Sequence, residues 1–317
     1  MKALRLGLAT LLAATVMGSA NAASIGLSTN YSLDWAVSIA TDEGSGITYN
    51  WDTNELWVIG DEGRWGRYSA ANGAALAALP ALNGYADPEG IAYLGGGNFA
   101  IAQERVMEIN KIVGLAPVAE ASAPSFDVNG PAGPVGNIGL EGISYDTRNG
   151  DFYGIKQEGP QAVYRMTGVN FAGGGTVTEL FNPALLGLSS LSDITVLSNS
   201  TAFAGSGAED NLLILSYPDA KLIEVTKAGA VLSALDLNGY SVRQIEGVTV
   251  DNAGNIFLVG EIGPGQTGSG GPSGILKFAR AGGAGAVPEP ATWAMMIGGF
   301  ALAGSTLRRR KLAVRFA

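Results

Sequence analysis

The stretch 141–159 reads Glu141-Gly142-Ile143-Ser144-Tyr145, then Asp146-Thr147-Arg148-Asn149-Gly150, then Asp151-Phe152-Tyr153-Gly154-Ile155-Lys156-Gln157-Glu158-Gly159. Its two outer parts contain β-branched and aromatic residues, which favour strands. Its middle part is rich in Asp, Asn and Gly, which adopt the backbone conformations of tight turns. The stretch therefore predicts a β-hairpin of two strands joined by a turn.

Five copies of this hairpin opening are spaced along the chain. They begin at Ser45, Glu89, Glu141, Asp193 and Glu246, at intervals of 44, 52, 52 and 53 residues. Repeats of about 50 residues that consist of strands indicate a β-propeller, in which each repeat is one blade of about four strands. We expect an all-β, five-bladed propeller, with six blades as an alternative and a β-solenoid as the main competitor. The last repeat lacks a clear fourth strand, and residues 31–39 are expected to supply it and close the ring.

The composition narrows the chemistry. The 317 residues include 47 glycines but no cysteine and no histidine. These absences exclude disulfides, thiolate metal sites, a Ser-His-Asp triad and any zinc site that needs imidazole. Carboxylates, hydroxyls, a few lysines and hard metals bound through oxygen remain as chemical groups.

Acidic residues recur at two positions of the repeat. In a propeller the start of a blade's innermost strand and the end of its second strand lie on the same face, so both sets are expected at one mouth of the channel. The first set is Glu89, Glu141, Asp193 and Glu246, and the second is Glu62, Glu104, Glu158 and Glu261, with Glu209 in a looser context. Clustered carboxylates repel one another unless they are protonated, paired or bridged by a metal. A set of oxygen ligands without His or Cys predicts calcium as the cofactor.

Both ends of the chain are typical of sorting signals. Residues 1–22 combine a basic start, an apolar run and a small-residue cleavage site that ends at Ala22, which predicts a signal peptide. At the other end, Pro288-Glu289-Pro290 precedes the apolar stretch 292–307 and a basic cluster at 308–311. We expect a propeller domain at 23–280, a flexible linker at 281–287 and a sorting and anchor segment at 288–317.

The C-terminal pattern resembles the PEP-CTERM tail of Gram-negative bacteria. That resemblance implies cleavage near Pro288-Glu289-Pro290 by an exosortase, after transient anchoring in the inner membrane by a hydrophobic helix at 292–307. The protein is then expected at the cell surface or in the extracellular matrix. Removal of both ends would take away seven of the 19 basic residues and one of the 28 acidic residues, leaving a net charge of −15. Nucleic acid is therefore not an expected partner, since phosphate contacts need a basic face.

The body of the chain also resembles a known family. The runs 44–63 and 141–159 are similar to motifs of the SdiA-regulated, YjiK-like propeller family. The resemblance implies a five-bladed propeller with a bound calcium ion. This chain departs from the family pattern at Ser45, where other repeats have an acid, and in the fourth repeat, which lacks the glycine.

Two functions follow from these observations, and a propeller scaffold without metal, in which the acids are structural, is a third possibility. The first is an exported, calcium-binding propeller that acts as a binding or structural module outside the cell, with an unidentified extracellular ligand or polysaccharide as its partner. The alternative is a calcium-dependent hydrolase of the lactonase, esterase or phytase kind, in which Glu141 or Glu246 would be the catalytic base. The sequence marks no recognisable nucleophile, and we therefore expect the first function. Neither the ligand nor the oligomeric state is encoded in a readable motif.

Overall fold

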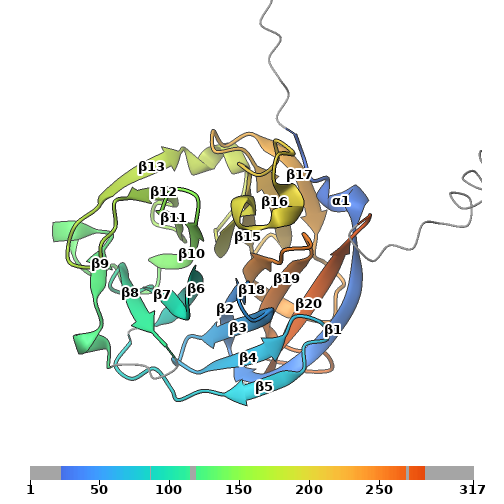
Figure 1. Cartoon of the computed structure of the whole chain (residues 1–317), viewed down its shortest axis with the longest axis horizontal. Coiled ribbons are helices and arrows are strands. Elements are labelled where there is room, and N and C mark those ends of the chain that lie inside the picture. The colour runs from blue at the N-terminus through green and yellow to red at the C-terminus, as the bar shows by residue number, and fades with distance from the viewer. Residues whose placement is uncertain (1–22, 86, 115–118, 269–270, 283–317) are drawn as a thin grey trace, which may run out of the picture.

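The computed structural model describes residues 23–282, with the exception of residues 86, 115–118 and 269–270. Within this part of the chain, twenty strands form five four-stranded antiparallel sheets that are arranged around a central axis (Figure 1). Each sheet is one blade of a propeller. The prediction of five blades is confirmed, and the six-bladed alternative is wrong.

The first four blades each take four strands that are consecutive in the chain. Blade 1 contains β2 (Gly44–Asn50), β3 (Glu55–Gly60), β4 (Trp65–Ser69) and β5 (Ala75–Ala78). Blade 2 contains β6 (Pro88–Gly95), β7 (Asn98–Gln103), β8 (Glu108–Val113) and β9 (Ser125–Asp127). Blade 3 contains β10 (Leu140–Asp146), β11 (Asp151–Lys156), β12 (Ala162–Thr167) and β13 (Thr176–Phe181). Blade 4 contains β14 (Asp193–Val196), β15 (Leu212–Ser216), β16 (Lys221–Val225) and β17 (Val231–Asp236).

Blade 5 joins the two ends of the described chain. Its strands run from the channel outwards in the order β18 (Arg243–Val250), β19 (Ile256–Ile262), β20 (Pro272–Arg280) and β1 (Tyr31–Asp42). The N-terminal strand therefore supplies the outermost strand of the last blade, as the sequence predicted. This pairing closes the ring, because a blade that lacked β1 would expose the edge of β20.

Short helical segments precede the first strand or connect later strands. They are α1 (Leu27–Asn30) and the 3-10 helices η1 (Glu120–Ser122), η2 (Gly130–Ala132), η3 (Pro183–Leu186), η4 (Leu197–Asn199) and η5 (Thr201–Phe203). The segment before β1 docks on blade 4. The buried carboxylate of Glu224 on β16 accepts hydrogen bonds from Ile25 N at 2.9 Å, Asn211 Nδ2 at 2.8 Å and Ser233 Oγ at 2.7 Å. The N-terminal segment thus spans the seam between blades 4 and 5.

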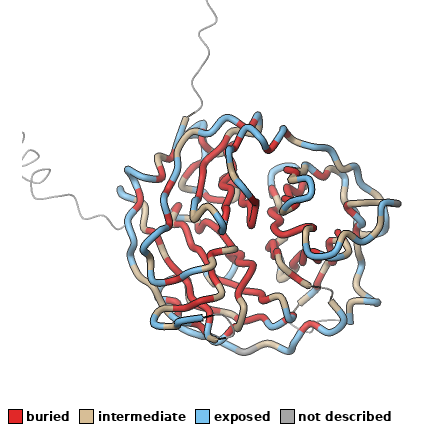
Figure 2. Tube along the Cα trace, turned by 180° about the vertical axis from the view of Figure 1, so that it is seen from behind, coloured by how far each residue is buried: buried red, intermediate tan, exposed pale blue. Residues whose placement is uncertain are grey.

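The hydrophobic core lies between neighbouring blades. Buried residues concentrate on the inner strands, and the exposed positions follow the outer rim (Figure 2). The strands around the channel approach one another closely at the repeated glycine. A Cβ atom added to Gly46 would lie 2.4 Å from the backbone oxygen of Glu89, and one added to Gly247 would lie 2.8 Å from the oxygen of Ser45. Glycine is therefore required at these two positions for the inner strands to pack side by side.

Hydroxyl groups connect the inner strands of successive blades. Thr48 Oγ1 accepts a hydrogen bond from Tyr93 N at 3.0 Å, and Ser144 Oγ accepts one from Val196 N at 3.1 Å. Thr249 Oγ1 does the same for Tyr49 N at 3.1 Å and so links the last blade to the first. The Ser or Thr that follows the apolar residue of the repeat therefore satisfies a backbone donor that would otherwise be buried without a partner.

The predicted sorting segments lie outside the described residues. These are the signal peptide at 1–22 with its cleavage site at Ala22, Pro288-Glu289-Pro290, and the apolar stretch 292–307. Among the residues that the structure describes, no helix has the length and apolar character needed to cross a membrane.

Candidate metal centre at the acidic mouth

In four of the five blades, a β-bulge sets the direction of the side chain at the start of the inner strand. In β6, Pro88 pairs with Gln103 and Gly90 pairs with Ala102, so Glu89 is the extra residue of the bulge. The same irregularity occurs in β2, β10 and β18, and such bulges re-aim a side chain. We call this place the strand-start position. It is occupied by Ser45, Glu89, Glu141, Ser192 and Glu246 in blades 1 to 5.

A second position lies two residues beyond the partner of the repeated glycine, just past the second strand or at its end. Gly46 pairs with Ile59, and Asp61 follows two residues later. We call this the hairpin-end position. It is occupied by Asp61, Glu104, Gln157, Tyr217 and Glu261 in blades 1 to 5.

A third position was missed by the sequence reasoning. It lies two residues before the strand-start position and contains Glu43 in blade 1, Asp87 in blade 2 and Gln244 in blade 5. These residues have φ angles of 48°, 61° and 48°, which are uncommon for residues other than glycine. Backbone strain of this kind concentrates at functional sites. A repeat-by-repeat alignment would have found Glu43 and Asp87, but their strained backbone is visible only in the structure.

The tightest acidic group lies at the seam between blades 1 and 2. Asp61, Asp87 and Glu89 each offer a carboxylate oxygen, and these three oxygens lie within 4.8 Å of one another. Calcium binds oxygen ligands at about 2.3–2.6 Å, so ligands on opposite sides of one ion are separated by about 5 Å. The three carboxylates are therefore close enough to share one cation. Asp87 also accepts a 2.6 Å hydrogen bond from Arg105 Nε, which partly compensates its charge.

Burial makes the charged forms of these acids costly. It raises the pKa of Asp61 to about 6, that of Glu89 to about 8 and that of Glu104 to about 7. Burial, followed by the charges of nearby acids, also raises the pKa of Glu141 and of Glu246 well above the usual range. A cation would relieve both the repulsion and the desolvation, since it stabilises the ionised carboxylates.

Two carboxylate oxygens at this mouth are buried without a partner. Glu104 Oε2 and Asp61 Oδ1 accept no hydrogen bond from the described residues, and Glu104 is only 1% exposed. Leaving such a group unsatisfied is costly, which favours a ligand that is not part of the protein chain. The residues present therefore fit a hard divalent cation.

The structure places the predicted ligands in different surroundings. Glu89, Glu104, Glu141, Glu246 and Glu261 lie at the acidic mouth, where they influence one another's pKa. Glu62 is one residue beyond the hairpin-end position, and its side chain is 64% exposed and close to Arg64. Glu158 is likewise one residue too far along and is exposed, while Gln157 occupies the hairpin-end position of blade 3. Glu209 precedes β15, which places it at the opposite end of the blade.

Asp193 takes the place of the repeated glycine rather than the strand-start position. Blade 4 has no bulge there, because Asp193 pairs directly with Leu215. Its buried carboxylate accepts hydrogen bonds from Val248 N at 2.7 Å and from Ile194 N at 2.8 Å. Burial still raises its pKa well above the usual range. The observed partners of this acid are therefore backbone donors of blades 4 and 5.

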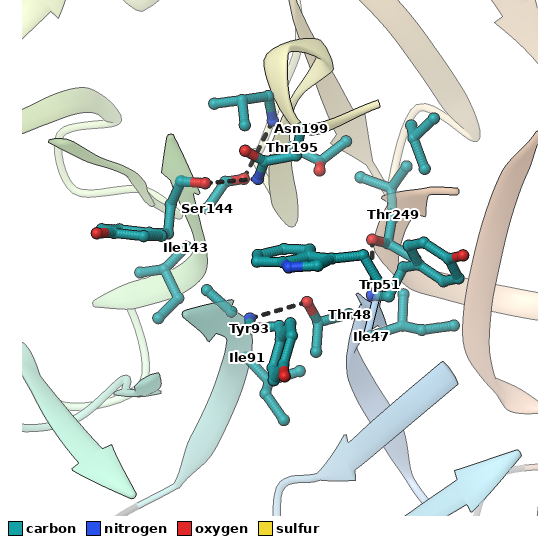
Figure 3. A pocket seen from close by; sticks show the side chains of 16 residues that line it. Ile47, Thr48, Trp51, Ile91, Tyr93, Ile143, Ser144, Thr195, Asn199 and Thr249 are labelled. Carbon is teal, nitrogen blue, oxygen red and sulfur yellow. Dashed lines mark hydrogen bonds between the residues drawn. The ribbon is translucent and has the colours of Figure 1, made fainter. Parts of the chain in front are cut away.

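The opposite end of the channel is occupied by an aromatic side chain. The indole of Trp51, from the β2–β3 turn, extends across the ring of inner-strand residues (Figure 3). It contacts Tyr93 edge-on, with 4.5 Å between ring centroids. The space that remains there is about 20 Å³, room for roughly one water molecule. Nothing within the β2–β3 hairpin alone indicates this position, because it depends on the closure of the ring.

The fold and the site together define the class of protein: a five-bladed β-propeller with clustered carboxylates at one mouth of its channel. The chain belongs to the SdiA-regulated family, whose model matches residues 23–265. Residues 286–311 match the PEP-CTERM protein-sorting motif. This motif is a sorting signal that implies export, exosortase processing, and sorting to the surface or to a membrane-associated location.

The solved structures that are similar to this chain are distant from it in sequence. Glutaminyl cyclase from Myxococcus xanthus is 12% identical, with a TM-score of 0.53 over 79% of this chain and 97% of that chain. A gluconolactonase from Xanthomonas campestris is 12% identical, with a TM-score of 0.48 over 77% and 89% of the two chains. Streptogramin B lyase is 15% identical, with a TM-score of 0.40 over 72% of this chain and 66% of its own length. At 12% identity the similarity to the glutaminyl cyclase concerns the fold alone.

Proposed function

We propose that this protein is an exported, surface-sorted propeller that binds calcium at its acidic mouth and acts as a binding or structural module outside the cell. One observation carries the proposal: Asp61, Asp87 and Glu89 converge to within 4.8 Å at the seam of two blades. Calcium would neutralise this group and would connect blade 1 to blade 2. Glu104, Glu141, Glu246 and Glu261 are further ligand candidates around the same mouth.

The direction in which the chain leaves the propeller supports a mouth that is open to the exterior. In β20, Gly274 pairs with Gly260 near the acidic mouth, whereas Phe278 pairs with Ile256 at the other end of the blade. The strand ends at Arg280, and the sorting motif follows. The acidic mouth therefore lies on the face opposite to the point where the tail departs.

Thermal unfolding of residues 23–286 tests the calcium site. The sample is measured first with excess EDTA, then with calcium, and in parallel with an equal concentration of magnesium. A ligand that binds only the folded state raises the unfolding midpoint. At a ligand concentration of 100 times the dissociation constant, the free energy of unfolding increases by about 2.7 kcal/mol. A shift of several degrees with calcium that magnesium does not reproduce is the expected result. An unchanged midpoint would remove the calcium proposal.

A calcium-dependent hydrolase is the second candidate. It is favoured by the raised pKa values of Glu141 and Glu246, since perturbed carboxylates are common at catalytic sites. The test is a screen of esters, lactones and phosphoesters with the wild-type protein and with Glu141→Gln and Glu246→Gln. Calcium-dependent turnover that both variants lose would support the enzyme. Variants that lose calcium affinity, together with a wild type that turns over none of these substrates, would support the binding module.

A further inference from the structure

A recess opens between blades 4 and 5, next to the acidic mouth. It has a volume of about 360 Å³, within the range of small-ligand sites. Its lining combines aromatic, apolar and polar groups, and the residues that matter for its chemistry are Tyr217, Leu237, Asn238, Tyr240 and Arg243. We call it the blade 4–5 recess.

The register of the strands places this recess on the same face as the carboxylates. Tyr217 occupies the hairpin-end position of blade 4, where blades 1, 2 and 5 have Asp61, Glu104 and Glu261. On the other side, Arg243 opens β18, three residues before Glu246 at the strand-start position. A ligand in the recess would therefore lie beside the acidic mouth.

Arg243 differs from most arginines of the described chain in its partners. Arg64, Arg67, Arg105, Arg148 and Arg165 each form an ion pair with a carboxylate. The exposed guanidinium of Arg243 donates one hydrogen bond to the Gln266 carbonyl oxygen at 2.7 Å and has no ion-pair partner among the described residues. In a chain with a net charge of −9, an arginine without an acidic partner is available to an external anion. A guanidinium binds a carboxylate in a bidentate manner.

Two tyrosines give the recess flat surfaces. Tyr240 is held in place by an edge-on contact with the buried Phe278, with ring centroids 5.1 Å apart. Tyr217 is 39% exposed, which is unusual for a large aromatic side chain in this protein. Next to them, Asn238 is positioned by hydrogen bonds to Asp236, 2.8 Å from both its backbone and its side-chain nitrogen. Flat rings beside amide and hydroxyl groups suit a ligand with an apolar face and a hydroxylated rim.

We propose that the blade 4–5 recess binds a carboxylated pyranose, that is, a uronate, as a free sugar acid or as a unit of an anionic polysaccharide. The sugar carboxylate pairs with Arg243, the ring stacks on Tyr217, and the hydroxyl groups face Asn238. This inference rests on the proposed function as a binding module, and it names the chemistry of the ligand.

Calorimetric titration of the full-length chain in detergent tests the proposal. The probes are galacturonate, a galacturonate oligomer and galactose, each with and without calcium. We expect the two acidic probes to bind and galactose to bind at least about tenfold more weakly, because it lacks the charged group. Tighter binding of the oligomer would identify an anionic polysaccharide as the ligand. Equal affinity per sugar unit would identify the free sugar acid as the ligand.

Variants assign the contact to the recess. Arg243→Gln should weaken uronate binding at least about tenfold and leave galactose binding unchanged. Tyr217→Ala should weaken the binding of both sugars. Arg64→Gln is the matched control, since it removes an exposed arginine that already has acidic partners, and should bind like the wild type. Uronate binding that is absent, or unchanged by Arg243→Gln, would overturn the inference. The calcium-dependent shift in unfolding is a separate readout, so that either proposal can fail without the other.

Discussion

Asp61 at the end of the first hairpin of blade 1 and Glu89 at the bulge of β6 in blade 2 bring carboxylate oxygens within 4.8 Å of each other. They are 28 positions apart in the chain and belong to different sheets. This proximity places the best candidate cation site at a seam between two blades, away from the central axis of the channel. It also makes the choice between Asp61 and its neighbour Glu62 testable.

Replacement of Asp61 should weaken calcium binding much more than replacement of Glu62. Asp61→Asn removes one charge from the group of three, and we expect the dissociation constant to rise at least about tenfold, because affinity follows the number of charged ligands. Glu62→Gln removes a charge from an exposed side chain one residue away, and it should change affinity by less than about threefold. Calorimetric titration with calcium measures both. Equal effects of the two variants would contradict the assignment of the hairpin-end position.

The stability of the calcium-free protein should fall as the pH rises. Asp61, Glu104 and Glu89 have pKa values raised by burial to about 6, 7 and 8, above the value of about 4 expected in the unfolded chain. Because the folded state then binds more protons than the unfolded state, the stabilisation is complete below about pH 4 and is lost as the pH rises through about 6 to 8. Urea unfolding in EDTA across this range measures the effect.

Calcium should reverse that trend, since it binds the ionised carboxylates. The gain in stability from calcium is therefore expected to grow between about pH 5 and pH 8. Stability in EDTA that increases over the same interval would contradict the raised pKa values at the mouth.

The repeated glycine should not tolerate a methyl group. In Gly46→Ala the new Cβ would lie 2.4 Å from the backbone oxygen of Glu89, so that the inner strands of blades 1 and 2 would have to separate. We expect a loss of about 1–3 kcal/mol in the free energy of unfolding. Gly268→Ala is the control, because among the described residues no heavy atom beyond its chain neighbours lies within 4 Å of its added Cβ. Chemical denaturation of both variants gives the difference, and similar stabilities would argue against close approach at the channel.

The docking of the N-terminal segment on blade 4 should depend on the buried carboxylate of Glu224. Glu224→Ala leaves the side chains of Asn211 and Ser233 and the backbone nitrogen of Ile25 without their acceptor. Each unsatisfied buried donor costs about 1–3 kcal/mol, so the variant should lose more than about 2 kcal/mol of stability. Hydrogen exchange of β1 should accelerate as well, because this strand follows the docked segment. Glu179→Ala, at an exposed position of β13, is the control and should change neither property.

The hairpin repeat made the number of blades and the closure by the N-terminal strand predictable. Both follow from periodic strand and turn residues that can be counted along the chain. The strand-start acids Glu89, Glu141 and Glu246 were found for the same reason, since each precedes the repeated glycine. The hairpin-end acids were found only in part, because Glu62 and Glu158 are each one residue away from the position that the strand register defines.

Three aspects of the candidate site depended on the register between strands and blades. Asp193 was grouped with the strand-start acids because blade 4 has no glycine to align on, and the direct pairing of Asp193 with Leu215 shows that this strand has no bulge. Asp87 was missed because its position precedes the recognisable repeat. Trp51 was missed because nothing in a single hairpin indicates that its turn faces the channel.

The sequence by itself determined the architecture of this protein, because alternating strand and turn residues encode each blade locally and their period encodes the number of blades. Only the tertiary structure decided which carboxylates share one site. The contacts between Asp61, Asp87 and Glu89 join two blades, and their geometry depends on a bulge and on a left-handed residue that shift the side chains by one position. A shift of one residue reverses the direction of a side chain in a strand, so the pairing register, and not the presence of acids, defines the site.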